Sequence, residues 1–220
     1  MLKLTARDGH QLGAHIARPS GPPRGGVVVV QEMYGLNDYL RAVCEFYAAH
    51  GYLAIAPALY DRHQPELIFA YSKQDHDRAQ QVYKNWNDDL ALDDMDAARD
   101  VVASAGRVGI VGFCWGGTLA WLAARRRDYA CAVAYYGSMM PNHATEQPRC
   151  PVIAHIGNHD TTLPPSRIDV FRAAQPKVPV YLHAGAQHGF DNRDRHPRYH
   201  EQACLEARER TLAFFAAHIG

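Results

Sequence analysis

The sequence predicts an α/β fold in which a mostly parallel sheet is flanked by helices. Four short segments are apolar and rich in β-branched or aromatic residues, namely 26–31, 52–56, 107–111 and 151–156. Continuous apolar runs are typical of strands that are covered on both faces. Helical patterns separate these segments along the chain, and strands that alternate with helices indicate a parallel sheet.

The remaining elements follow from the same patterns. We expect further strands at 130–136 and 178–183, and helices at 39–50, roughly 75–103, 115–126, 165–174 and 199–217. Residues 1–17 alternate in polarity and contain Asp8-Gly9, which is a hairpin signal, so antiparallel strands are expected at one edge of the sheet. Ligand sites in open α/β sheets lie at the carboxyl ends of the strands, so chemistry is expected there.

Length and composition narrow the class of protein. A chain of 220 residues predicts a single domain over 1–220. Basic and acidic residues number 23 each, so no nucleic acid or membrane partner is expected. The start, MLKLTARDGH, lacks the apolar region of a signal peptide, and no run is long enough to span a membrane. We therefore expect a soluble, cytoplasmic protein.

Cysteine and histidine usage argues against disulfides and metal. The 5 cysteines are odd in number, and no two are spaced as C-x-x-C, which is unlike a disulfide framework or a zinc knuckle. No predicted helix carries H-x-x-x-H, so no metal site is expected.

Cys114 lies at the corner between an expected strand and an expected helix, in the run GFCWGG from Gly112 to Gly117. This is the nucleophile-elbow pattern with cysteine in the serine position. The glycines allow the two flanking segments to pass close together. The start of a helix favours a thiolate, and the N–H of Trp115 is placed to bind an oxyanion. The alternative is a buried cysteine in a tight turn.

A nucleophile of this kind needs a base and a group that orients the base, in the chain order acid and then histidine. Asp160 follows the strand at 151–156, and His188 follows the strand at 178–183. We assign Asp160 as the orienting acid and His188 as the base. His159 and His183 remain competitors for the role of base.

Glu32 and Met33 directly follow the first apolar strand. The loop at this position is expected to give the second oxyanion N–H, that of Met33. A carboxylate at the end of a buried strand is costly without a partner, so Glu32 is expected to bond the Cys114 thiol or an arginine. An ion pair that only holds the loop is the alternative.

Together these motifs resemble the dienelactone hydrolase family of α/β-hydrolases, the carboxymethylenebutenolidases. The resemblance covers nearly the whole chain, through QEMYGLND, PALYDR, YKNW, GFCWGG, YYG, GNHD, PSR and HGF in that order. It implies an α/β-hydrolase fold with minimal or no lid. It also implies a triad of Cys114, His188 and Asp160, with Glu32 hydrogen-bonded to the cysteine in the resting enzyme.

The same resemblance implies an activity. Family members open the enol-lactone ring of dienelactones in the breakdown of aromatic compounds, and the cysteine would act through a thioester acyl-enzyme. The expected ligand is a small-molecule lactone or ester, no metal or organic cofactor is expected, and the protein is expected to be a monomer or weak homodimer.

One departure from the family concerns the substrate carboxylate. Two arginines hold it in dienelactone-specific members, and the matching positions here are Ala79 and Asn192, with Arg78 and Arg193 beside them. A shift of one residue turns a helical side chain by about 100°. The clamp is therefore lost, or rebuilt from Arg78, Arg193 or Arg62.

Aromatic side chains at the same strand ends are candidates to line an apolar pocket or to belong to the core: Tyr34, Tyr60, Tyr83, Trp86, Trp115 and Phe190. Two other functions stay open. One is an esterase or thioesterase of the same family that acts on a different activated ester. The other is a thiol sensor or ligand-binding protein without turnover.

Overall fold

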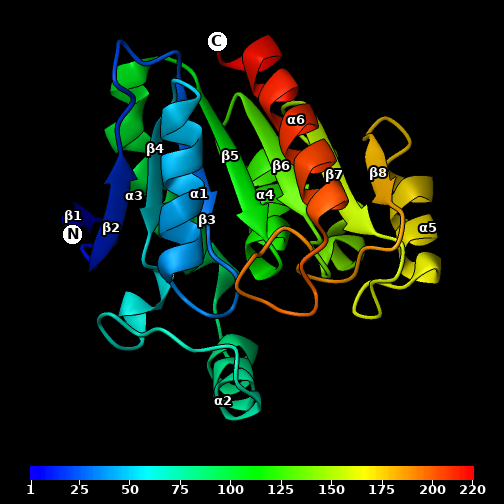
Figure 1. The fold of residues 1–220 in the computed structure, drawn as a ribbon. Coiled ribbons are helices and arrows are strands. Elements are labelled where there is room, and N and C mark those ends of the chain that lie inside the picture. The colour runs from blue at the N-terminus through cyan, green and yellow to red at the C-terminus, as the bar shows by residue number, and fades with distance from the viewer. The chain divides into compact units, whose positions relative to one another are not determined.

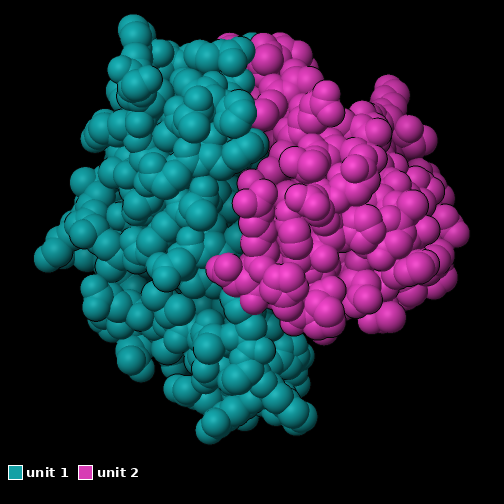
Figure 2. Space-filling model, viewed as in Figure 1, with its two compact units in different colours: residues 1–109, 219 teal, residues 110–218, 220 magenta.

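Strands and helices alternate along the chain in the computed structural model, which describes residues 1–220 (Figure 1). The chain divides into two compact units, residues 1–109 with 219 and residues 110–218 with 220 (Figure 2). The helix and strand pattern agrees with the predicted α/β class, and each expected strand is present.

Unit 1 contains the elements β1 (Leu2–Thr5), β2 (Gln11–Ala17), β3 (Gly26–Val30), α1 (Asp38–Ala49), β4 (Leu53–Pro57), η1 (Leu59–Arg62), α2 (Lys73–Lys84), α3 (Asp88–Val102) and η2 (Ala103–Ala105). Its strand order is β1-β2-β4-β3. The pairs β1–β2 and β2–β4 are antiparallel, and β3–β4 is parallel. The expected antiparallel edge is therefore confirmed, with Gly9 in the left-handed region at the turn.

Helices cover both faces of β3 and β4. α1 packs against β2, β3 and β4, and α3 packs against β1, β3 and β4 from behind the sheet in the view of Figure 1. This two-sided cover explains why every residue of β3 is buried. The apolar face of α1 is formed by Tyr39, Leu40, Val43 and Tyr47, which recur at helical spacing.

Unit 2 contains most of β5 (Val108–Phe113), followed by α4 (Trp115–Arg126), β6 (Cys131–Tyr135), η3 (Met140–His143), β7 (Val152–Gly157), α5 (Pro165–Ala174), β8 (Val180–His183) and α6 (Glu201–His218). Its strand order is β5-β6-β7-β8, and the pairs β6–β7 and β7–β8 are parallel. Both α4 and α6 pack against β6. No helix of the chain is both long enough and apolar enough to cross a bilayer.

The helix expected over roughly 75–103 is in fact two helices. α2 ends at Lys84 and α3 begins at Asp88, with Asn85, Trp86 and Asn87 between them. The Asn87 side chain accepts a hydrogen bond from the N–H of Asp89 at 3.0 Å, which caps the start of α3. Asparagine favours such caps over helix interiors, so the two asparagines interrupt an otherwise helical pattern.

Candidate active site

Cys114 occupies the sharp turn between β5 and α4 that the glycine pattern predicts. Its backbone has φ 56° and ψ −114°, a left-handed conformation that is uncommon for a residue with a side chain. A Cβ on Gly112 would overlap the carbonyl group of Gly116, so glycine is required where β5 and α4 cross. The N–H of Cys114 donates to the carbonyl of Tyr135 at 3.0 Å, which ties the turn to the end of β6.

The loops after β7 and β8 carry Asp160 and His188, and backbone hydrogen bonds join these loops. The N–H of Asn158 donates to the carbonyl of His183 at 3.0 Å, and the N–H of His159 donates to that of Ala186 at 2.9 Å. Residues that are 28 apart in sequence are thereby held in one place at the carboxyl ends of parallel strands.

Cys114, His188 and Asp160 form one hydrogen-bonded chain. His188 Nε2 lies 3.1 Å from the Cys114 sulfur, and His188 Nδ1 lies 2.8 Å from Asp160 Oδ2. The other oxygen of Asp160 accepts the N–H groups of Thr162 and Leu163, at 2.8 and 3.0 Å. His188 and Asp160 are buried, and the side chain of Cys114 is only partly covered. This geometry is that of a nucleophile, a base and an orienting carboxylate.

The hydrogen bonds among Cys114, His188 and Asp160 shift the pKa values of His188 and Asp160 in directions that favour their charged forms. Burial would lower the pKa of His188, but its electrostatic interaction with Cys114 and its hydrogen bonds to Asp160 and Cys114 outweigh burial and raise that pKa to about 10. Burial would raise the pKa of Asp160, but the hydrogen bond and charge of His188, with two backbone N–H groups, hold it below its usual value. The imidazolium and the carboxylate are therefore the favoured forms at neutral pH.

Tyr136 also contacts this chain, and sequence reasoning about the site did not single it out. Its ring meets that of His188 edge-on with 5.0 Å between centroids, and it packs on Phe190 at 5.4 Å. The residue has a positive φ of 40° directly after β6. Its N–H donates to the carbonyl of His155 at 2.8 Å. The only sequence signal was the YYG motif, which says nothing by itself about contact with a histidine.

The two competing histidines lie in different surroundings. His159 is exposed in the loop before Asp160. His183 is buried, and its Nε2 lies 3.1 Å from His155 Nδ1. His155 Nε2 in turn lies 3.3 Å from the hydroxyl of Thr211 on α6. Burial lowers the pKa of His155 well below its usual value and, less strongly, that of His183. His183 is thus part of a buried network under α6.

The loop after β3 carries Glu32 and Met33 and is anchored within unit 1. Glu32 is fully buried, and Met33 is 8% exposed. The carbonyl of Met33 accepts the Tyr60 hydroxyl at 2.9 Å, and the N–H of Phe69 donates to the carbonyl of Tyr34 at 3.0 Å. The backbone that carries the expected second oxyanion donor is therefore held in place from both sides.

Two of the three arginines considered for a carboxylate clamp, Arg62 and Arg193, contact other side chains of the protein. Ala79 and Asn192, which occupy the two clamp positions, are completely buried. Arg62 forms a close ion pair with Asp94 and a second with Asp8. Arg193 is exposed and lies over the ring of Tyr199, 5.8 Å from its centroid.

A buried arginine that sequence reasoning missed lies beside the triad. Arg195 is 7% exposed, and its guanidinium lies against Gly189, the residue after His188. It stands in the run NRDRHPR, which reads as a solvated, charged loop, so the sequence holds no signal for its burial.

The aromatic residues that were expected either to line an apolar pocket or to belong to the core lie in different environments. Phe190 is fully buried against Tyr136 and His183. Tyr34 is buried, with its hydroxyl 2.9 Å from His76 of α2. Trp115 is buried as the first residue of α4, and Tyr83 of α2 is half-buried.

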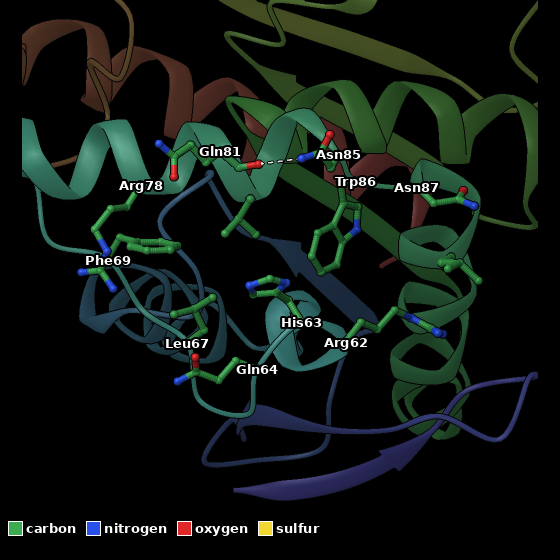
Figure 3. Close-up of a pocket in the computed structure, with 12 residues that line it drawn as sticks. Arg62, His63, Gln64, Leu67, Phe69, Arg78, Gln81, Asn85, Trp86 and Asn87 are labelled. Atoms are coloured by element: carbon green, nitrogen blue, oxygen red, sulfur yellow. Dashed lines mark hydrogen bonds between the residues drawn. The ribbon is translucent and has the colours of Figure 1, made fainter.

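Trp86 and Arg78 line a cavity of about 500 Å³ in unit 1 (Figure 3). No residue of the triad contributes to its lining. No group of three or more His, Cys, Asp and Glu side chains in the chain is arranged to hold a metal ion.

Comparison with known proteins identifies relatives over nearly the full length. The sequence pattern of the dienelactone hydrolase family matches residues 12–219. The chain is 33% identical over 227 residues to the carboxymethylenebutenolidase of Pseudomonas putida, covering 98% of this chain and 95% of that protein. The range matched by the family pattern spans the positions of all the predicted site residues.

Solved structures show the same likeness. The chain is similar to a candidate dienelactone hydrolase from Klebsiella pneumoniae, with a TM-score of 0.86, 29% identity and 97% of each chain covered. It also shares its fold with an alpha-beta serine hydrolase homologue from Coxiella burnetii, with a TM-score of 0.68 at 15% identity over 97% of this chain and 95% of that one. The predicted α/β-hydrolase fold is confirmed.

Proposed function

The chain belongs to the dienelactone hydrolase family and is a carboxylic ester hydrolase, and from that premise we propose that it opens activated lactones or esters with Cys114 as the nucleophile. The acyl group is carried as a thioester on Cys114 and is then released by water. A thiol sensor or binding protein without turnover, the third reading of the sequence, does not account for membership of a hydrolase family.

The observation that supports this proposal is the chain of hydrogen bonds from Asp160 through His188 to the Cys114 sulfur, with lengths of 2.8 and 3.1 Å. The carboxylate fixes the tautomer and orientation of the imidazole, and the imidazole takes the thiol proton. Because the pKa of His188 is raised to about 10, the imidazole is a strong enough base to take the thiol proton when the substrate is attacked.

Acylation begins when the thiolate adds to the substrate carbonyl carbon. The carbonyl oxygen takes the electron pair and becomes an oxyanion. We assign the N–H of Trp115, the first in α4, as one oxyanion donor and the N–H of Met33 as the other. When the carbonyl re-forms, the bond from the carbonyl carbon to the ring oxygen breaks, and His188 gives its proton to the departing oxygen.

The leaving group determines which esters a cysteine thiolate can cleave. A thiolate leaves more easily than an alkoxide, so the adduct of an ordinary ester returns to the starting materials. An enolate or phenolate is a far better leaving group than an alkoxide, so the adduct of an activated ester proceeds to the thioester. Water then attacks the thioester, His188 takes the water proton, and the thiolate is restored.

We assign Glu32 as a hydrogen-bond partner of Cys114 in the resting enzyme. This role follows from the family resemblance, and the complete burial of the carboxylate in the loop after β3 supports it. A buried carboxylate without a hydrogen-bond partner costs free energy. Glu32 is therefore not simply a solvent-exposed surface charge.

A second candidate is an esterase or thioesterase for activated esters without a carboxylate, and one observation favours it. Both positions that hold the clamp arginines in dienelactone-specific relatives are fully buried and uncharged here, Ala79 and Asn192. Arg62 is neutralised by its ion pairs with Asp8 and Asp94. A substrate carboxylate would then depend on Arg78 or Arg193.

The two candidates are separated by comparing dienelactone with p-nitrophenyl acetate in a spectrophotometric assay. Cys114→Ser should lower kcat/KM for both substrates by at least about 100-fold, since the alcohol is not activated as the thiol is. Cys150→Ser is the matched control, because Cys150 is also a free and partly covered cysteine. Faster turnover of dienelactone supports the lactonase, and faster turnover of the simple ester supports the second candidate. Unchanged rates in Cys114→Ser would refute both.

A further inference from the structure

One peptide unit at the end of β6 connects the Cys114 turn to the neighbouring strand β7. The carbonyl of Tyr135 accepts the N–H of Cys114 at 3.0 Å, and the N–H of the same peptide unit, that of Tyr136, donates to the carbonyl of His155 at 2.8 Å. A peptide unit is planar and rigid, so a change in its tilt moves both hydrogen bonds together. The orientation of the peptide unit 135–136 therefore bears directly on the backbone of Cys114.

The two residues whose N–H groups are held in this way both have left-handed backbones. The angle φ is 56° at Cys114 and 40° at Tyr136. Such a conformation costs free energy in a residue with a side chain, and it persists only where the surrounding structure fixes it. Both residues also contact the imidazole of His188, Cys114 through its sulfur at 3.1 Å and Tyr136 through its ring. Contacts that hold these two backbones against relaxation therefore also hold the triad in shape.

The side chains of Tyr135 and His155 converge on one hydroxyl, that of Thr211. The register of β6 and β7 places Tyr135 opposite His155, with 4.8 Å between their ring centroids. The Tyr135 hydroxyl lies 2.8 Å from Thr211 Oγ1, and His155 Nε2 lies 3.3 Å from it. Thr211 belongs to α6, which packs against β6 (Figure 1), and all three side chains are fully buried. One oxygen of α6 thus anchors both residues whose carbonyls hold Cys114 and Tyr136.

The directions of these hydrogen bonds follow from the single proton of the Thr211 hydroxyl. That hydroxyl donates to the carbonyl of Ala207 at 2.8 Å, one turn earlier in α6. The Tyr135 hydroxyl and the Nε2–H of His155 therefore both donate to Thr211 Oγ1. His155 Nδ1 is then an acceptor, and it receives the Nε2–H of His183 at 3.1 Å. Burial holds the pKa of His155 well below its usual value, so its imidazole is neutral, as this arrangement requires.

We propose that Thr211 is a positioning residue of the active site, which fixes the peptide unit 135–136 and, through it, the Cys114 turn. The inference rests on the proposed role of Cys114 as the nucleophile. Thr211 acts through Tyr135 and His155 and not on the reacting atoms. A sulfur that moves with a relaxed turn loses its alignment with His188 Nε2, and misplacement by about 1 Å can lower a rate by about 100-fold.

Two substitutions of Thr211 separate its hydrogen bonds from its packing. Valine has nearly the same shape and accepts no hydrogen bond, whereas serine keeps the hydroxyl. With p-nitrophenyl acetate, we expect Thr211→Val to lower kcat by about 10-fold and to leave KM within about twofold, because the turn moves and the substrate pocket does not. Thr211→Ser should keep kcat within about threefold of wild type, since both donors retain their acceptor. An unchanged kcat in Thr211→Val, or an equal loss in both variants, would overturn the proposal.

The route through Tyr135 is tested with Tyr135→Phe, which removes the hydroxyl and leaves the ring in place. This variant should also lower kcat. The double variant with Thr211→Val should be no slower than Thr211→Val alone, because effects along one path are not additive. If the two single losses multiply in the double variant, Thr211 does not act through Tyr135 and the proposal is wrong. Tyr135→Phe leaves Thr211 bonded to Ala207, so it carries the test even if Thr211→Val fails to fold.

Hydrogen exchange of single amides, followed by NMR, gives a readout that needs no turnover. Relative to the amide of Ala120 within α4, the amides of Cys114 and Tyr136 should exchange at least about 10-fold faster in Thr211→Val, because their acceptor carbonyls are held less firmly. Phe215→Leu is the matched control, since Phe215 is also fully buried on α6, one turn after Thr211, and its truncation loosens packing without removing a hydrogen bond. It should leave kcat and this exchange ratio within about twofold of wild type. An equal acceleration in Phe215→Leu would assign the effect to a general loosening of α6 and overturn the proposal.

The two readouts separate this inference from the proposed function. Full turnover in Cys114→Ser refutes the proposed function, whatever Thr211→Val does to the rate. Faster exchange at Cys114 in Thr211→Val, in a protein without hydrolase activity, would refute the function and leave the anchoring by Thr211 standing. Unchanged exchange in a protein whose activity depends on Cys114 would refute the positioning role alone.

Discussion

Replacing Asp160 by asparagine tests the working of the triad with almost no change of shape. The amide oxygen can still accept the N–H groups of Thr162 and Leu163, so the loop after β7 should keep its conformation. The amide nitrogen, however, faces His188 Nδ1, which now lies 2.8 Å from a carboxylate oxygen. The imidazole must then accept at Nδ1 and carry its proton on Nε2.

The magnitude follows from what the carboxylate does. Its hydrogen bond and charge are two of the effects that raise the pKa of His188 to about 10. Without them the pKa of His188 is lower, and a neutral imidazole in this orientation has its donor, rather than its lone pair, on the side of the Cys114 sulfur. Loss of this carboxylate in a serine triad lowers kcat by about 10⁴-fold. We expect kcat/KM to fall by about 10³- to 10⁴-fold for Asp160→Asn, which corresponds to about 4 to 5.5 kcal/mol of barrier.

Two assays check this prediction. One is steady-state hydrolysis of p-nitrophenyl acetate, and the other is the rate of alkylation of Cys114 by iodoacetamide at pH 7, which reports the thiolate without a substrate. Asp169→Asn is the control, since Asp169 is an exposed aspartate of α5 and should leave both rates within about twofold. If Asp160→Asn keeps more than a tenth of the wild-type kcat/KM, the triad as described is wrong.

Two further predictions concern stability. Gly112→Ala should lower the free energy of unfolding by about 3 kcal/mol or more in urea titrations, since its Cβ overlaps backbone of α4, whereas Gly21→Ala, where nothing lies near the Cβ, should be neutral. The buried pair His155 and His183 should make the protein less stable in acid. Their pKa values are lower in the folded state, so the unfolded chain takes up more protons as pH falls below about 6.5. His183→Gln should flatten the fall of stability between pH 7 and 5, and an unchanged slope would exclude the pair as its cause.

Local sequence signals predicted the elements that carry the chemistry. α4 runs from Trp115 to Arg126 as expected, because the glycine-rich corner before it admits a single path from strand to helix. Asp160 and His188 lie on loops after parallel strands, and the parallel register brings those loops together. The break between α2 and α3 was missed, because two asparagines act as caps only once the chain turns there.

Contacts that depend on side-chain direction could not be predicted. The contact of Tyr136 with His188 depends on a positive φ after β6, for which a tyrosine gives no sequence signal. Arg62 forms ion pairs with Asp8 and with Asp94, which lie 54 and 32 positions away from it in the sequence. The cavity around Trp86 is lined by a mixture of exposed, half-buried and buried side chains from helices and loops, so no apolar pattern in the sequence marks it.

The central claim, a thioester on Cys114, is tested most directly by trapping it. Protein mixed with p-nitrophenyl acetate and quenched in acid within milliseconds should show an acetyl group, removable by neutral hydroxylamine, on the peptide that carries Cys114. The label should persist in Cys150→Ala and disappear in Cys114→Ala. Acetylation of another residue in the wild type, or full turnover by Cys114→Ala, would contradict the account.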